Sequence, residues 1–198
     1  MTILVRDVRE HELDSVLALN NTAGPSILAL DAPALHRLWS IADYFRVAEV
    51  DGLLAGFLIA MDRSADYDSP NFRWFRERYD AFLYVDRIVV ATTRRGAGVG
   101  RVFYADVQSY AEVRVPMLTS EVFLDEGSDA ALLFHGTFGY GEVGQQVMEG
   151  PGRRVSLLAK TLCSYEWVRE TYGDELPDVP WLAGRRRPAG GASRATGT

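Results

Sequence analysis

The amino-acid sequence predicts an α/β protein of the layered α+β kind, with a mixed central sheet of about six or seven strands flanked by about four or five helices. Three observations lead to this prediction. Segments rich in β-branched residues alternate with segments whose apolar residues recur at helical spacing. An Asp-Gly pair joins two strand-like segments, and a glycine-rich stretch joins a strand to a helix.

The length and composition limit the classes of protein that fit. We expect one folded domain over residues 1–162, followed by a C-terminal helix and flexible tail over 163–198. The formal net charge of −6 argues against nucleic acid as a partner, since that binding needs clustered basic groups. No apolar run is long enough to span a membrane and no signal peptide is visible, so we expect a cytoplasmic protein without a membrane partner. Cys163 is the single cysteine, which excludes an internal disulfide and a cysteine-built zinc site; we expect no metal.

The first half of the chain predicts a strand, two helices and a hairpin. Asp31 is a good N-cap for the second helix, and Pro33 suits its first turn. Asp51-Gly52 supplies the positive φ angles of a tight hairpin turn. The expected elements are a strand over 3–8, helices over 11–20 and 31–42, and hairpin strands over 44–50 and 53–61.

An insert over residues 62–80 carries Phe72, Phe75 and Tyr79 at spacings of three and four. It is either a short amphipathic helix that completes the core or a lid over a pocket. Residues 82–90 are nearly continuous in apolar and β-branched residues, which is typical of a buried central strand.

The second half predicts a crossover unit and a closing hairpin. A helix over 100–113 links the central strand to a strand over 116–124, so these two strands should be parallel. Ser128 is a good N-cap for a helix that Gly139 stops. The remaining expected elements are hairpin strands over 141–149 and 153–162, a helix over 164–173 and a low-complexity tail over 184–198.

The glycine-rich stretch lies between a strand and a helix, where backbone amides commonly hold phosphate. A P-loop would need Gly-Lys followed by Ser or Thr, but the chain has Gly100-Arg101-Val102. A dinucleotide-binding loop would need G-x-G-x-x-G; Gly96 and Gly98 fit, but Arg101 stands at the third position. Both are disfavoured. A tight turn beside solvated arginines is a further interpretation.

A third pattern, R/Q-x-x-G-x-G/A, is satisfied from Arg95 to Gly100. With this loop in this order of elements, the chain resembles the GNAT (Gcn5-related N-acetyltransferase) superfamily over about Ile3 to Leu162. The resemblance implies splayed fourth and fifth strands, and acetyl-CoA as co-substrate. It assigns pairing with the pantetheine amides to Ile88, Val89 and Val90, and the pyrophosphate to the loop of Arg95, Gly96, Ala97, Gly98, Val99, Gly100 and Arg101.

Acyl transfer to an amine needs a base for the ammonium group and an acid for the leaving thiolate. The family commonly supplies the acid as a tyrosine within A-x-x-F/L-Y-x-x-x-G-F. Residues 131–140 match this stretch, but His135 replaces the tyrosine and Tyr140 the last phenylalanine. His135 either donates to the thiolate or only contacts cofactor or solvent. Ser128, where the family often has a cofactor-proximal asparagine, is equally explained as a helix cap.

Asp86 and Glu121 are the candidate bases, because the resemblance places the acyl group between their strands. Strand alternation puts Asp86 on one face with Ile88 and Val90. The alternative for each carboxylate is to face solvent or to pair with a nearby arginine such as Arg87 or Arg73. Four polar residues of the insert are further candidates to bind a cationic acceptor: Asp62, Asp66, Tyr67 and Asp68.

These assignments predict an N-acetyltransferase that transfers acetyl directly to a primary amine of a small molecule or peptide. Cys163 follows the last strand, which is a poor place for a nucleophile, so we favour a ternary complex over an acyl-enzyme. The acceptor would be selected by residues 20–26, the second helix and residues 62–79. A non-catalytic acyl-CoA sensor of the same fold is the alternative, and a homodimer stays open.

Overall fold

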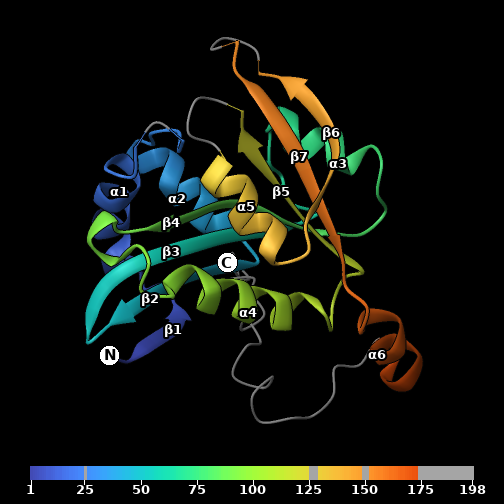
Figure 1. The fold of residues 1–198 in the computed structure, drawn as a ribbon, viewed down its shortest axis with the longest axis horizontal. Coiled ribbons are helices and arrows are strands. Elements are labelled where there is room, and N and C mark those ends of the chain that lie inside the picture. The colour runs from blue at the N-terminus through green and yellow to red at the C-terminus, as the bar shows by residue number, and fades with distance from the viewer. Residues whose placement is uncertain (25, 125–128, 149–151, 174–198) are drawn as a thin grey trace, which may run out of the picture.

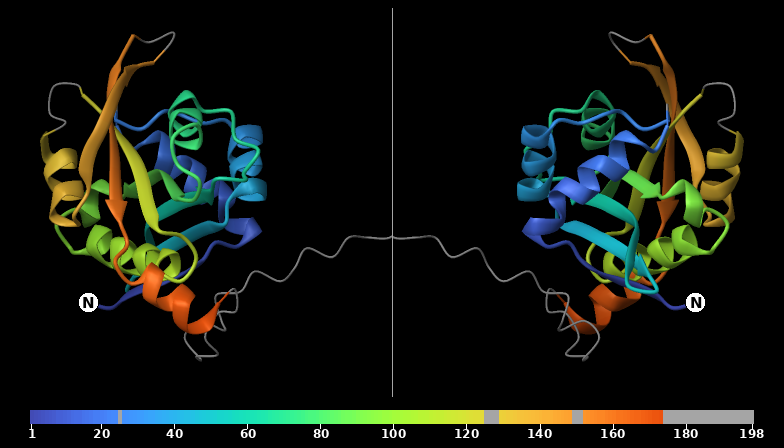
Figure 2. Two further views of the ribbon diagram at one scale, coloured as in Figure 1. Left: turned by 90° about the vertical axis from the view of Figure 1, so that its right-hand side faces the viewer. Right: turned by 90° about the vertical axis from the view of Figure 1, so that its left-hand side faces the viewer.

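A computed structural model describes residues 1–24, 26–124, 129–148 and 152–173. These residues form one seven-stranded sheet in the order β1-β2-β3-β4-β5-β7-β6 with helices on both faces (Figure 1). Helices α1, α2 and α3 pack on one face, while α4 and α5 pack on the other. Figure 2 shows these two groups of helices on opposite sides of the strands. The predicted layered fold is therefore confirmed.

The N-terminal elements are β1 (Ile3–Asp7), α1 (Leu13–Asn21), α2 (Ala32–Ile41), β2 (Tyr44–Val50) and β3 (Leu53–Asp62). Asp31 caps α2 as predicted, because its Oδ1 accepts a hydrogen bond from the Ala34 N–H at 2.8 Å. The predicted hairpin turn is also confirmed: Asp51 and Gly52 have φ angles of 51° and 81°.

The insert after β3 contains α3 (Pro70–Arg76), which begins after the N-cap Ser69. Phe72 and Phe75 are fully buried and pack among other aromatic rings of the α1–α3 face. The amphipathic-helix interpretation is confirmed.

The central crossover is β4 (Leu83–Val90), α4 (Val99–Ala111) and β5 (Met117–Phe123). β4 and β5 are parallel, as predicted, but they pair only between Leu83–Val85 and Leu118–Ser120. Beyond these pairs the two strands diverge, as the resemblance implied. Within the described part of the chain, the edge of β4 from Asp86 to Val90 thus has no strand partner on the β5 side, and a cleft opens there.

A bulge in β4 corrects one expectation. Ile59 of β3 pairs with Arg87 and the next residue, Ala60, pairs with Val85, which leaves Asp86 as an extra residue. Such an insertion interrupts the alternation of side chains along a strand. Asp86 bonds to Tyr67 and Arg87, whereas Ile88 packs on the α4 face. The expectation that Asp86 shares a face with Ile88 and Val90 is wrong.

The remaining elements are α5 (Asp129–Thr137), β6 (Gly141–Val147), β7 (Arg154–Thr161) and α6 (Tyr165–Tyr172). β6 and β7 form the predicted antiparallel hairpin, and β7 lies between β5 and β6 in the sheet. The proposed cap Ser128 and the tail over 174–198 lie outside the described residues. Among the helices that are described, none is both long enough and apolar enough to cross a bilayer.

Candidate functional site

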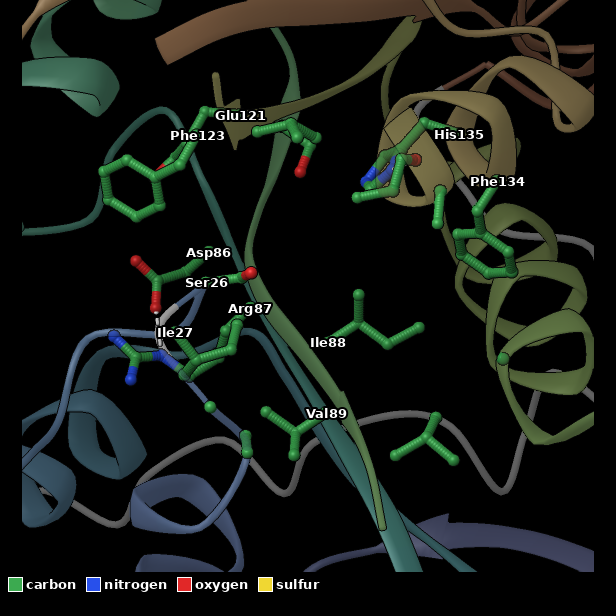
Figure 3. A pocket seen from close by; sticks show the side chains of 18 of the residues that line it. Ser26, Ile27, Asp86, Arg87, Ile88, Val89, Glu121, Phe123, Phe134 and His135 are labelled. Atoms are coloured by element: carbon green, nitrogen blue, oxygen red, sulfur yellow. Dashed lines mark hydrogen bonds and ion pairs between the residues drawn. The ribbon is translucent and has the colours of Figure 1, made fainter. Parts of the chain in front are cut away.

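A pocket of about 840 Å³ occupies the cleft where β4 and β5 diverge. Figure 3 shows β4 crossing it, Glu121 projecting from β5, and His135 on the opposite wall. Six segments form most of its walls: the α1–α2 connection, the insert after β3, β4, the glycine-rich loop with the start of α4, β5, and α5.

The glycine-rich loop forms one end of the pocket. Gly96 and Gly98 have φ angles of 78° and 87°, in the region that favours glycine, and the space where their side chains would stand is open. Helix α4 begins at Val99, so its first amides have no carbonyl one turn earlier. The first of them to bond back into the loop is the Val102 N–H, which donates to the Gly98 O at 3.1 Å. The unused amides and the positive end of the helix dipole suit an anion such as phosphate.

Two loop residues, Gly100 and Ala97, take part in packing or in a turn of the loop. A Cβ at Gly100 would lie 2.9 Å from the Phe134 ring of α5, so this glycine allows the two helices to approach. The Ala97 N–H donates to the Arg94 O at 3.3 Å, and Ala97 is not among the pocket-lining residues. Except for Ala97, all the loop residues assigned from the sequence line the pocket, as do three β4 residues: Arg95, Gly96, Gly98, Val99, Gly100 and Arg101, with Ile88, Val89 and Val90.

Three arginines add positive charge at this end: Arg94, Arg95 and Arg101 line the pocket. Arg95 has a further contact, since its Nη2 donates to the Ala23 O of the α1–α2 connection at 2.9 Å. This side chain therefore joins two walls of the pocket.

Asp86 lies toward the other end of the pocket, and hydrogen bonds fix its carboxylate. Its side chain is 3% exposed, accepts from Arg87 Nε at 2.6 Å, and accepts from the Tyr67 hydroxyl at 2.5 Å. Arg87 also donates from Nη1 to Asn20 Oδ1 at 2.9 Å. Of the two arginines considered from the sequence, Arg87 is the partner of Asp86; Arg73 pairs with Asp68 at 2.5 Å. The Arg87 guanidinium balances the charge of Asp86.

Glu121 lines the same pocket from β5, and its carboxylate accepts a hydrogen bond from the Tyr84 hydroxyl. Burial raises the pKa of Glu121 to about 8, and the negative charge of Asp86 adds to the rise, while hydrogen bonds from Tyr84 and Asn71 oppose it. A carboxylate with such a pKa is a much stronger base than an ordinary glutamate, and both of its protonation states are populated near neutral pH.

His135 is 5% exposed and faces the pocket from α5 (Figure 3). Its Nδ1 lies 2.8 Å from the Ala131 O. Because a carbonyl oxygen only accepts, Nδ1 carries the hydrogen, and Nε2 of the neutral ring is an acceptor. Burial lowers the pKa of His135 and so favours this neutral ring. Nε2 has no hydrogen-bond partner among the residues that the structure describes.

The three candidate aspartates of the insert are bonded to residues outside the pocket, and none of them lines it. Asp62 Oδ1 accepts from the Ser64 N–H at 2.6 Å, Asp66 pairs with Arg37 at 2.8 Å, and Asp68 pairs with Arg73. From the insert, Tyr67, Ser69 and Asn71 line the pocket.

Sequence reasoning missed the polar residues that hydrogen-bond to Glu121, namely Asn71 and Tyr84. Asn71 is 1% exposed and Tyr84 is fully buried. A polar amide beside the apolar positions of α3 was the available signal for Asn71. Nothing in the pattern of β4 distinguished Tyr84 from a core residue.

The sequence matches no known family model and no curated protein. Its structure is similar to solved structures. The ribosomal-protein-S18-alanine N-acetyltransferase of Escherichia coli has a TM-score of 0.61 at 14% identity, with 81% of this chain and 94% of that chain covered. Ribosomal-protein-alanine N-acetyltransferase from Brucella melitensis gives 0.61 at 24% identity, with 80% and 99% covered.

Arabidopsis thaliana Naa50, solved in complex with the bisubstrate analogue CoA-Ac-MVNAL, gives a TM-score of 0.59 at 14% identity, with 81% of this chain and 99% of that chain covered. The match extends over nearly the whole length of each neighbour, and it includes the parallel β4–β5 pair of a mixed seven-stranded sheet. The chain therefore has the fold of the GNAT N-acetyltransferases.

Proposed function

We propose that this protein is an acetyl-CoA-dependent N-acetyltransferase, which transfers the acetyl group directly to a primary amine of a small molecule or peptide in a ternary complex. One observation carries the proposal: a single pocket joins an anion-binding helix start to a carboxylate with the pKa of a base, along an unpaired strand edge. The solved neighbours with this fold are N-acetyltransferases, which supports the same reaction class here.

In this proposal acetyl-CoA would lie along the pocket, with its pyrophosphate at the glycine-rich loop. The amides at the start of α4 and the nearby arginines would hold the pyrophosphate. The free edge of β4 from Asp86 to Val90 would pair with the pantetheine amides as an added strand does. This arrangement directs the thioester toward Asp86, Glu121 and His135.

The three titratable groups divide the proton transfers between them. Asp86, fixed by Arg87 and Tyr67, would orient the alkylammonium ion by accepting a hydrogen bond from it. Glu121 takes one proton from this ion, and the free amine then attacks the thioester carbonyl carbon. As the C–S bond breaks, the nitrogen must lose a second proton and the sulfur must gain one. We assign this transfer to His135, whose Nε2 accepts the first and donates to the second.

The ligand is tested first, and turnover second. Acetyl-CoA should raise the melting temperature of the full chain in a concentration-dependent manner, whereas NAD(H) and ATP should not. Release of CoA thiol is then followed over a panel of alkylamines, aminoglycosides, polyamines and short peptides. Stabilisation by NAD(H) instead of acetyl-CoA would refute the assignment of the loop.

A non-catalytic acyl-CoA sensor is the second candidate, and the neutral His135 favours it, because its proton lies on Nδ1 and is bonded to the Ala131 O, which leaves Nε2 without a proton to donate. A sensor would be stabilised by acetyl-CoA as an enzyme would. It would release no thiol above the rate of hydrolysis with any amine of the panel.

A further inference from the structure

The α1–α2 connection forms a wall of the pocket through residues 22–24 and 26–28. Two arginines from the opposite side hold it. Arg87 of β4 donates from Nη1 to Asn20 Oδ1 at 2.9 Å and to the Leu28 O at 3.3 Å. Arg95 of the glycine-rich loop donates from Nη2 to the Ala23 O at 2.9 Å. The two arginines differ in how firmly the rest of the protein fixes their side chains.

Arg87 is fixed from within the protein. Its side chain is 9% exposed, and Asp86 holds its Nε at 2.6 Å. The Asn20 side chain strengthens this end, since its Nδ2 donates to the same Leu28 O at 3.1 Å. The attachment at residues 20 and 28 is therefore complete without any ligand.

Arg95 is exposed and belongs to the loop that would hold the pyrophosphate. The next residue, Gly96, already has a positive φ of 78°, and Gly98 has one of 87°. An anion bound by amides of this loop would fix the backbone directly after Arg95. The orientation of the guanidinium toward the Ala23 O would then be fixed as well.

We propose that Arg95 is a positioning residue that couples occupancy of the cofactor loop to residues 22–24 of the pocket wall. The inference rests on the proposed function, because the ligand of the loop is taken to be CoA. Binding at the loop tightens the Arg95–Ala23 contact and so orders this wall. Coupling between two sites is reciprocal, so an acceptor that needs the ordered wall binds more tightly after CoA than before it.

Amide hydrogen exchange on the full chain, with and without saturating CoA, tests this coupling. In the wild type, CoA should slow exchange at residues 96–101 and, about five-fold or more, at residues 22–24. In Arg95→Ala, protection of 96–101 at saturating CoA should remain, while the effect on 22–24 is lost. Arg95→Lys, which keeps a charged donor, should restore part of it.

Arg94→Ala is the matched control, because it removes an equal charge from the same wall without touching Ala23. It should weaken CoA binding, yet at saturation both segments should be protected as in the wild type. Undiminished protection of 22–24 in Arg95→Ala overturns the inference, and so does faster exchange there when CoA binds the wild type. If CoA fails to protect 96–101 in the wild type, the proposed function is refuted together with this inference.

Discussion

Replacing Glu121 with Gln tests the assignment of the base most directly. The change keeps the shape of the side chain but removes its ability to take a proton. Burial and the charge of Asp86 raise the pKa of Glu121 to about 8. In the wild type, kcat/KM for an alkylamine should therefore rise with pH and level off above about pH 8, since the ionised form is the base.

The size of the loss follows from this pKa. At pH 8 about half of the Glu121 side chains are ionised, whereas only about one alkylamine in 250 is neutral when its pKa is about 10.4. Without the base, the reaction depends on that neutral fraction. Glu121→Gln should lower kcat/KM by about 100-fold at pH 8, the lower end of what a positioned general base contributes, equivalent to about 2.7 kcal/mol in the activation free energy. In the pH profile of kcat/KM for this variant, the rising limb should move toward the pKa of the amine.

The assay is steady-state thiol release across pH 6 to 10, with the CoA dissociation constant measured for each variant. Glu77→Gln is the matched control, since Glu77 is exposed directly after α3 and lies outside the pocket; its profile should equal that of the wild type. Asp86→Asn should shift the limb below about pH 8, because it removes a charge that raises the pKa of Glu121. A Glu121→Gln profile that coincides with the wild type would refute the assignment of the base.

The raised pKa of Glu121 also predicts how the free energy of unfolding depends on pH. The folded-state pKa of about 8 lies above the ordinary value of 4.5, so the folded chain binds the extra proton between these values. The free energy of unfolding contributed by Glu121 is fully present below about pH 4.5 and is lost as pH rises through about 8, by up to about 1.4 kcal/mol per pH unit. Urea titrations should show this slope in the wild type, and Glu121→Gln should lack it.

Three further changes test the loop, the core and the acid. Gly98→Ala places a side chain at a φ of 87°, so it should lower the free energy of unfolding by about 1 kcal/mol and weaken CoA binding in calorimetry; Gly141→Ala, without a positive φ and with open space at its Cβ, is the control. Phe75→Ala should lower the free energy of unfolding by about 3–5 kcal/mol in urea, whereas Leu133→Ala, at a side chain 70% exposed, should change it by less than about 0.5 kcal/mol. His135→Ala should reduce kcat by about 100-fold or more with little change in CoA affinity, and an unaltered pH–rate profile would remove His135 from the mechanism.

Local sequence signals predicted the order of elements because each signal acts over a few residues. The cap at Asp31 and the turn at Asp51-Gly52 have the same physical cause in the folded chain as in the sequence. The bulge at Asp86 has no such signal, because it depends on how β3 and β4 pair. Strict alternation therefore assigned Asp86 to the wrong face.

The sequence predicted which segments of the chain form the candidate site, but not the contacts between residues that are far apart in the sequence. The family resemblance implied that Asp86 and Glu121 should flank one site, and both line the pocket. It could not indicate that Arg95 reaches Ala23, a contact between residues that are 72 positions apart. The requirement for glycine at position 100 likewise comes from the Phe134 ring of another helix.

The bulge also explains why two carboxylates in one pocket have different roles. The extra residue turns Asp86 toward the side of the sheet where Arg87 and Tyr67 hold it, so its charge is compensated inside the protein. Glu121 has hydroxyl and amide donors but no guanidinium bonded to it, and its pKa rises. Regular alternation would separate Asp86 from Arg87, and two uncompensated carboxylates would then compete for one proton. In the proposed mechanism the bulged strand therefore leaves Asp86 bonded to Arg87 and Tyr67, and leaves Glu121 to take the proton.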